Sequence, residues 1–193
     1  MNDPQSPRPV KVIMLGDSSV GKTSIVLQFY KSEFEVNGEP TVGAAYVTKV
    51  VKTITGKEIT LHIWDTAGQE RFKSVIPMYM RGCSAIVLVC ATDSIDSIQA
   101  LNDWMKIVTD NVDISEVNVY LVLNKIDKPP VFDISVAESW AKERDYAFFK
   151  TSAKEKKNID ELFQKIAEDL SASAQVPATP AEPERKTEKK GCC

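Results

Sequence analysis

Apolar and polar residues alternate along the chain in two different rhythms, which predict strands and helices in turn. Residues 10–15 form an apolar run typical of a buried strand, and residues 24–30 carry apolar side chains at helical spacing. Residues 42–51 and 58–64 favour two strands joined by a turn at residues 53–57. The first part of the chain is therefore predicted to form a strand, a helix and an antiparallel hairpin.

The second part repeats a strand and helix pattern. Residues 85–91 are apolar on both faces, as in a central parallel strand, and residues 117–123 and 147–150 favour two more strands. Apolar spacing predicts helices around residues 98–108 and 135–144. These repeated units favour an α/β fold, a mostly parallel six-stranded sheet with one antiparallel hairpin strand and helices on both faces.

Capping signals support two of the later helices. Ser135 and Glu138 have the spacing of a capping box at the start of the helix at residues 135–144. Asn158 stands before an amphipathic stretch, with Glu161 at the N3 position. We therefore expect a final helix to begin directly after Asn158.

The stretch at residues 16–23 reads GDSSVGKT and fits the phosphate-binding pattern G-x-x-x-x-G-K-[ST]. Such a loop turns its backbone N–H groups onto phosphate oxygens, while Lys22 supplies a positive charge and Thr23 a hydroxyl ligand for Mg²⁺. Its place between a strand and a helix makes a chance match on a surface turn the weaker alternative. The residues expected around the phosphates are Ser18, Ser19, Val20, Gly21, Lys22, Thr23 and Ser24.

A second set of polar residues follows the second hairpin strand, in the sequence W-D-T-A-G-Q-E. Asp65 can reach Mg²⁺ from the end of that strand, directly or through water. Gly68 leaves the backbone free to approach a γ-phosphate, and Gln69 can orient an attacking water with its amide. We therefore expect Gln69 to be the catalytic residue.

Two further motifs follow later strands and predict which base is bound. The first contains Asn124, Lys125 and Asp127, and the second consists of Ser152, Ala153 and Lys154. A carboxylate accepts a pair of N–H donors, which the N1–H and 2-amino group of guanine offer and adenine does not. Asp127 is therefore expected to select guanine.

Composition excludes several classes of partner and places most of the chain in one domain. The 193 residues carry 24 Lys and Arg against 27 Asp and Glu, a net charge of −3, so no basic field would recruit nucleic acid. The apolar run at residues 85–91 is too short to cross a bilayer, and the first residues do not form a signal peptide. Cys83 and Cys90 are too far apart along one strand to form a disulfide, so we expect both in the core.

Together, the four motifs over residues 10–171 resemble the small GTPase superfamily and, within it, the Rab branch. The resemblance implies a P-loop NTPase small G domain that binds GTP and GDP with Mg²⁺ and hydrolyses GTP to GDP. It implies that Phe34 stacks on the edge of the guanine and that Thr41 completes the Mg²⁺ shell formed with Thr23 and Asp65. Tyr46, Trp64 and Tyr79 match an aromatic triad that presents an effector surface, although a packing role is an alternative.

The resemblance also implies a cycle and a set of partners. The GTP-bound state would recruit effectors to membranes in vesicle trafficking, and an exchange factor, a GTPase-activating protein and a GDP-dissociation inhibitor would control the cycle. Residues 41–46 and 76–79 are similar to the early-endosomal subgroup. Ser19, Gly38 and the pair Pro129 and Pro130 depart from the common pattern of the family without removing a ligand.

The two ends of the chain differ in composition from the part between them. Residues 1–9 are expected to form a disordered arm, and residues 172–193, rich in proline and charge, a flexible tail. The ending with Cys192 and Cys193 resembles a double geranylgeranylation signal, whereas free or palmitoylated thiols are the alternative. The expected location is the cytoplasmic face of intracellular membranes, in particular the early endosome, with a cytosolic pool.

Two other functions remain open at this point. A scaffold that holds GTP without hydrolysing it is favoured by Ser19 beside the phosphates, but the intact Thr23, Asp65 and Gln69 argue against it. A P-loop kinase that uses ATP would have no need of Asp127. No arginine lies between Thr23 and Thr41, so we expect slow hydrolysis that a partner accelerates with its own arginine.

Overall fold

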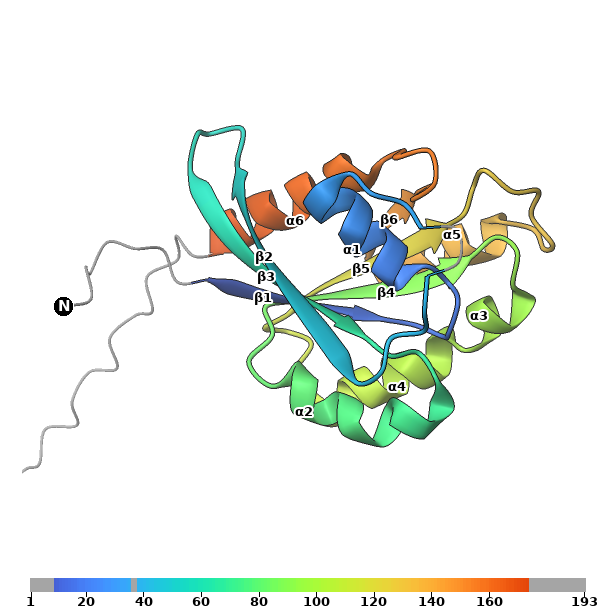
Figure 1. Ribbon diagram of the computed structural model, residues 1–193. Helices are drawn as coiled ribbons and strands as arrows, with labels where there is room; N and C mark the ends of the chain where they lie inside the picture. Colours follow the sequence, from blue (N-terminus) through green and yellow to red (C-terminus); the bar gives the residue numbers. More distant parts are fainter. Residues whose placement is uncertain (1–8, 36–37, 174–193) are drawn as a thin grey trace, which may run out of the picture.

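One sheet of six strands, in the order β2-β3-β1-β4-β5-β6, forms the centre of the molecule (Figure 1). The computed structural model describes residues 9–35 and 38–173. Strand β2 pairs with β3 in antiparallel fashion, and every other neighbouring pair is parallel. The predicted mostly parallel sheet with one antiparallel hairpin strand is therefore confirmed. The strands are β1 (Val10–Leu15), β2 (Ala44–Lys52), β3 (Glu58–Thr66), β4 (Ala85–Ala91), β5 (Asn118–Asn124) and β6 (Ala147–Lys150).

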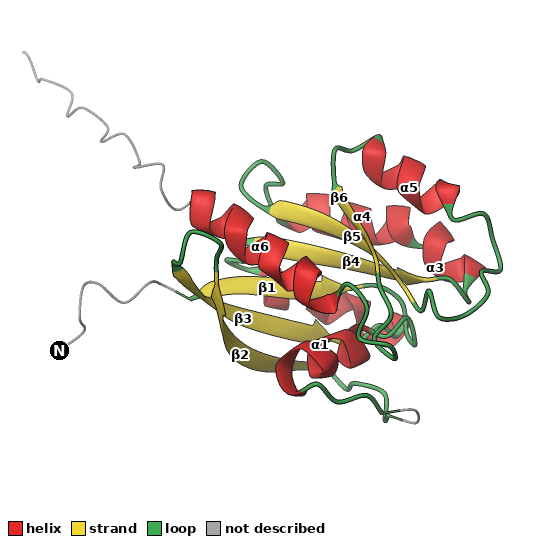
Figure 2. Ribbon diagram, turned by 90° about the horizontal axis from the view of Figure 1, so that it is seen from above, coloured by secondary structure: helices red, strands yellow, loops and turns green. Residues whose placement is uncertain are grey.

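Helices cover both faces of this sheet, as Figure 2 shows from above. Helices α1 (Lys22–Lys31) and α6 (Ile159–Ser173) pack on one face, where the rings of Phe29 and Phe163 stack with centroids 3.9 Å apart. The opposite face is covered by α2 (Ile76–Met80), α4 (Leu101–Asn111) and α5 (Ser135–Lys142). The short helix α3 (Ile95–Gln99) and the 3₁₀ helix η1 (Glu70–Val75) complete the fold.

Strand β4 shows why the sheet needs both layers. Each of its residues is buried, and alternate side chains enter opposite cores: Val87 and Val89 contact the α1 and α6 side, Ile86 and Leu88 the other. Burying each such side chain contributes about 1.5–3 kcal/mol. Cys90, on this strand, and the nearby Cys83 are buried and not bridged, so the prediction of core cysteines is confirmed.

Some local elements differ from the sequence-based expectations. The helix expected around residues 98–108 is divided at Ala100 into α3 and α4, because the hydroxyl of Ser94 accepts from Ser97 N and starts a separate helix earlier. The segment at residues 70–80, for which no element was predicted, forms η1 and α2.

The capping box of Ser135 and Glu138 is wrong. Asp133 Oδ1 accepts from the backbone N–H of Ser135 at 2.9 Å, so a carboxylate two residues earlier does the capping. Glu138 instead pairs with Lys150 of β6. Helix α6 begins directly after Asn158, as predicted. The predicted cap is not seen: the side-chain amide of Asn158 donates to the carbonyl of Lys150 at 2.7 Å, and among the described residues its side chain accepts no N–H of the first turn of α6.

Parts of the expected arm and tail lie outside the described residues. These are residues 1–8 and residues 174–193, which include Cys192 and Cys193. Within the described part of the chain, no helix combines the length and apolar composition needed to cross a bilayer.

The sheet places the predicted motifs at one edge. Strand β1 lies between β3 and β4, so the direction in which the chain adds strands reverses at β1. In such sheets ligands bind beyond the carboxyl ends of the strands at this point. The loops after β1, β3, β5 and β6 all leave the sheet at that edge.

Candidate functional site

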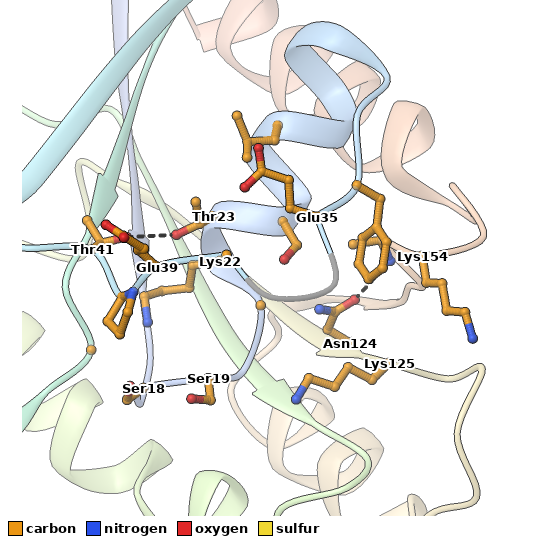
Figure 3. Close-up of a pocket in the computed structure, with 18 of the residues that line it drawn as sticks. Ser18, Ser19, Lys22, Thr23, Glu35, Glu39, Thr41, Asn124, Lys125 and Lys154 are labelled. Carbon is orange, nitrogen blue, oxygen red and sulfur yellow. Dashed lines mark hydrogen bonds between the residues drawn. The ribbon is translucent and has the colours of Figure 1, made fainter.

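A cavity of about 520 Å³ opens at this edge of the sheet (Figure 3). The structure brings together at its wall most of the residues that the sequence predicts for the site. They come from the loops after β1, β3, β5 and β6 and from the segment before β2. The predicted residues that line it are Ser18, Ser19, Gly21, Lys22, Thr23, Ser24, Phe34, Thr41, Gly68, Gln69, Asn124, Lys125, Asp127, Ala153 and Lys154.

Lys22 lies at the centre of the phosphate loop. Its side chain is buried, and Nζ donates to the carbonyls of Gly16 at 2.8 Å and Asp17 at 2.7 Å. Burial lowers the pKa of Lys22 to about 8, while the charges of Asp65 and Asp17 act in the opposite direction. An anion in the cavity would stabilise this buried ammonium, because a nearby opposite charge favours the charged form.

Two glycines let the backbone of the site pack closely. Gly21 has φ +97°, and a Cβ there would lie 2.4 Å from the side-chain nitrogen of Asn124. A Cβ on Gly68 would lie 2.4 Å from the carbonyl of Asp17 and 2.5 Å from Lys22 Nζ. The loop after β3 therefore rests directly on the phosphate loop, as only glycine permits.

Three side chains with oxygen atoms, Thr23, Thr41 and Asp65, meet beside the phosphate loop. The hydroxyls of Thr23 and Thr41 are 2.8 Å apart (Figure 3). Asp65 Oδ2 accepts from them at 2.6 Å and 3.2 Å. Burial raises the pKa of Asp65, which the hydrogen bond from Thr23 and the charge of Lys22 partly offset. Asp65 Oδ1 is buried and accepts no hydrogen bond from the described residues. One carboxylate and two hydroxyls fit Mg²⁺, which prefers hard oxygen ligands and keeps several waters.

Asn124 ties the far side of the cavity to the phosphate loop. Its side chain is buried, and Nδ2 donates to the carbonyl of Val20 at 2.9 Å. Its Oδ1 accepts from the hydroxyl of Thr151 at 3.1 Å and from Ala153 N at 3.3 Å. The side chain of Val20 is buried in the core, so Val20 can contribute only its backbone to the phosphate loop.

Asp127 is oriented by a residue that does not line the cavity. Ser152 is fully buried, and its hydroxyl donates to Asp127 Oδ1 at 2.6 Å while accepting from Glu155 N at 3.0 Å. A direct hydrogen bond therefore connects the two motifs. Phe34, 38% exposed, lines the same cavity from the loop after α1.

Gln69 lies between the end of β3 and the start of η1. It lines the cavity and occupies the N-cap position of η1 in an extended conformation. Its backbone carbonyl accepts from Phe72 N at 3.0 Å, which starts the 3₁₀ turn. The backbone of Gln69 is therefore held while its side chain stays at the cavity wall.

The side chains of the predicted aromatic triad, Tyr46, Trp64 and Tyr79, form a continuous row of rings. The ring centroids of Tyr46 and Trp64 are 5.5 Å apart, and those of Trp64 and Tyr79 are 5.8 Å apart. Tyr46 is 59% exposed, whereas Trp64 and Tyr79 pack against the core. The row therefore combines a packing role with an exposed aromatic face.

Several residues that support the site belong to none of the sequence motifs. Gln28 is buried in α1, and its Nε2 donates to the carbonyl of Ala153 at 2.7 Å. Trp104 Nε1 donates to Asp17 Oδ1 at 2.7 Å, which links α4 to the phosphate loop. Asp93 forms ion pairs with Lys125 and Lys128 of the loop that follows β5. The other cavity-lining residues that the sequence did not predict are Leu27, Glu35, Gly38, Glu39, Pro40, Thr66 and Lys128.

Comparisons with known proteins agree with this geometry. A family model described as "Ras family" matches residues 11–172. The GTP-binding protein ypt5 of Schizosaccharomyces pombe is 38% identical over 83% of this chain and 77% of its own length. The Ras-related proteins Rab-17 of Homo sapiens and Rab-31 of Mus musculus are 37% and 39% identical, over 86% and 84% of this chain and 79% and 84% of their own lengths.

Proposed function

Because the chain belongs to the Ras family of small GTPases, which hydrolyse GTP to GDP, we propose that it is a Rab-type switch for membrane traffic. The observation that carries the proposal is a single cavity that joins a phosphate loop, a cluster of oxygen ligands and a guanine-reading carboxylate. Each of these groups has a separate chemical task. Together they fit one guanine nucleotide and one Mg²⁺.

The nucleotide would lie along the cavity from Lys22 to Asp127. The backbone of residues 16–23 and the Lys22 ammonium would hold the phosphates, since their N–H groups and charge suit an anion. Asp127, oriented by Ser152, would accept the paired N–H groups of guanine. Phe34 would cover the base, and Lys125, Ala153 and Lys154 would complete its pocket.

In GTP hydrolysis these residues would act mainly by positioning the reacting groups. Gln69 would orient a water toward the γ-phosphate with its amide, and Gly68 would bring its backbone N–H close to the same group. Thr23, Thr41 and Asp65 would hold Mg²⁺, which when bound neutralises charge on the phosphates. Thr41 and Gly68 then sense whether the last phosphate is present, because both face that end of the cavity.

The same two residues would connect the nucleotide to partners. Thr41 lies just before β2 and Gly68 just after β3, the two strands that carry Tyr46 and Trp64. Ordering of these segments by GTP would set the aromatic row that effectors read. An exchange factor, a GTPase-activating protein and a GDP-dissociation inhibitor would act on the same segments.

The membrane on which the switch acts is proposed from the sequence and the relatives. Residues 41–46 and 76–79 are similar to the early-endosomal subgroup, and we place the protein on the cytoplasmic face of that compartment. Geranylgeranyl groups on Cys192 and Cys193 would hold it there, with the residues that follow α6 as a tether and a cytosolic pool in exchange.

Nucleotide competition tests the binding part of the proposal. Purified protein loaded with a fluorescent GDP analogue should release it to excess GDP or GTP and should retain it in excess ADP or ATP. The reason is that adenine lacks the pair of donors that Asp127 accepts. Equal displacement by adenine nucleotides would contradict the proposal and favour the kinase alternative.

Gln69→Leu tests the catalytic part. In a single-turnover assay with a cell extract as the source of activating protein, the variant should lose most of the roughly 10³- to 10⁵-fold stimulation that a supplied arginine gives. Gln99→Leu makes the same change at the exposed end of α3 and should respond like the original protein. A Gln69→Leu variant as fast as the original would contradict the assigned role, and GTP retained intact by the original would favour the scaffold alternative.

A further inference from the structure

The residues that directly follow β4 hold the loop that follows β5. Thr92 N donates to the carbonyl of Asn124 at 3.0 Å, and the Thr92 hydroxyl donates to the carbonyl of Lys125 at 2.6 Å. The Lys125 ammonium lies 3.1 Å from Asp93 Oδ1 and 3.2 Å from Oδ2. The Lys128 ammonium lies 2.7 Å from Asp93 Oδ2. Thr92 and Asp93 thus hold this loop by its backbone and by both of its lysines.

The loop needs such support because its backbone is strained. Lys125 has φ 63°, in the left-handed region that residues with a side chain rarely adopt. Such a conformation is unfavourable and persists only where surrounding contacts hold it. Thr92 holds the carbonyl of Lys125 and Asp93 holds its ammonium, so both ends of the strained residue are held by the residues that directly follow β4.

The ion pairs of Asp93 are partly shielded from water. The side chains of Asp93 and Lys125 are each 24% exposed, whereas that of Lys128 is 51% exposed. Burial raises the pKa of Asp93, but the hydrogen bonds from Lys128 and Lys125 outweigh it, and the net pKa is lowered. Asp93 is therefore a carboxylate at neutral pH, with its charge directed at the loop.

The segment held in this way contains the guanine-reading carboxylate. Asp127 lies between the two lysines that Asp93 binds, and Lys128 N donates to the carbonyl of Lys125 at 2.9 Å, which closes the turn around Asp127. We propose that Asp93 is a positioning residue for guanine recognition, which acts through Lys125 and Lys128 to aim Asp127 at the base. This inference rests on the guanine nucleotide site proposed above.

Asp93→Ala tests the inference by two measurements on the full chain. The dissociation rate of a fluorescent GDP analogue should rise about tenfold, since two partly exposed ion pairs are lost. The preference for GDP over IDP, which lacks the 2-amino group, should fall, because Asp127 no longer meets both donors. Single-turnover hydrolysis of bound GTP should not change, since Gln69 and the phosphate loop keep their contacts.

Two further variants make the result specific. Asp96→Asn removes one negative charge from the exposed first turn of α3, close in sequence but outside this set of contacts, and should leave both measurements unchanged. Asp93→Asn keeps an acceptor oxygen without the charge and should give an intermediate increase in GDP release. It also serves as the test variant if Asp93→Ala does not fold.

The outcomes separate this inference from the proposed function. Unchanged GDP release and an unchanged GDP to IDP ratio in the Asp93 variants would overturn the inference and leave the guanine site standing. A lower melting temperature with an unchanged ratio would also overturn it, because Asp93 would then only stabilise the fold. Failure of the original protein to bind GDP would overturn both.

Discussion

Ser19 shows how a single residue of the phosphate loop carries backbone strain. Its φ is 63°, and its side chain is exposed, so no packing compensates for the conformation. A left-handed backbone costs a residue with a Cβ about 1–2 kcal/mol, whereas glycine adopts it freely. Glycine also makes the unfolded chain more flexible, which destabilises the folded state by about 0.4–1 kcal/mol and offsets part of the relief of backbone strain.

We therefore predict that Ser19→Gly stabilises the protein by about 0.5–1 kcal/mol. Denaturant unfolding measures this, with GDP held at the same multiple of each variant's own dissociation constant and Mg²⁺ constant, because bound ligand shifts apparent stability by an amount that depends on its affinity. Ser18→Gly is the matched control: Ser18 does not have a positive φ, so glycine there should destabilise by about 0.5–1 kcal/mol. Destabilisation by Ser19→Gly would show that its backbone strain is negligible.

The core cysteines allow a chemical prediction. Burial raises the pKa of Cys90 to about 12 and also raises that of Cys83. The thiolate is the reactive form, so at pH 8 Cys90 stays almost entirely an unreactive thiol even before access is considered. In a variant with Cys192→Ser and Cys193→Ser, iodoacetamide should modify neither thiol in the folded protein and both in urea, as mass spectrometry would show. Modification of folded Cys90 would contradict its placement in the core.

The residues of the site divide by how they can be recognised in a sequence. Lys22, Asp65 and Asp127 stand in short motifs at strand ends, and chemistry alone indicates their tasks. Asp93 and Trp104 belong to no motif, since their meaning comes from partners on other strands and loops. Such contacts depend on which strands are neighbours, and local patterns do not encode that order.

At the scale of elements, the strands were more predictable than the helices between them. Fully buried β4 and the alternating β3 have distinct apolar patterns. Segments η1 and α2 lack a helical period and contain Pro77, so their conformation depends on packing of Ile76 and Met80 against the core. Tertiary contacts therefore decide the conformation of the segment that follows Gln69.

Helix α4 supports the phosphate loop through one hydrogen bond. Trp104 is buried, and it is the donor to the Asp17 carboxylate, while the Asp17 carbonyl accepts from Lys22. We predict that Trp104→Phe lowers the free energy of unfolding by about 2 kcal/mol, because a hydrogen bond to a charged group is worth about 1.5–3 kcal/mol. It should also speed GDP release. Both are measured at fixed Mg²⁺.

Trp140→Phe provides the control for this prediction. Trp140 Nε1 donates to Asn102 Oδ1 at 2.9 Å, but in an exposed setting and with a neutral acceptor, so the expected loss is below about 1 kcal/mol. If the two variants lose the same free energy of unfolding, the hydrogen bond between α4 and the phosphate loop stabilises the protein no more than an exposed one does.

At the scale of the whole molecule, alternation of strands and helices was enough to predict the parallel sheet and the edge at which its motifs gather. It did not predict the cavity, which needs Asn124 to bridge Val20 and Ala153 and needs Gly68 to lie against Asp17. The site is therefore a property of the assembled sheet, although the residues that act in it are local.

The proposed membrane anchor is tested at the same scale. One lipid chain gives only reversible binding, whereas two anchor a protein stably. With both Cys192 and Cys193 intact, we expect the protein in the membrane fraction of cells and two prenyl groups by mass spectrometry. Cys192→Ser or Cys193→Ser should leave it partly soluble, and the double variant should be fully soluble.

The switch should keep working in these variants, because the residues that line the cavity lie between 18 and 154 in the sequence and the variants change none of them. Release of the GDP analogue by the double variant should therefore match that of the original protein, which excludes misfolding as the cause of its solubility. A double variant that still sediments with membranes, or native cysteines without prenyl groups, would contradict the anchor. Such results would leave the guanine site intact, and native cysteines without prenyl groups would favour the alternative of free or palmitoylated thiols.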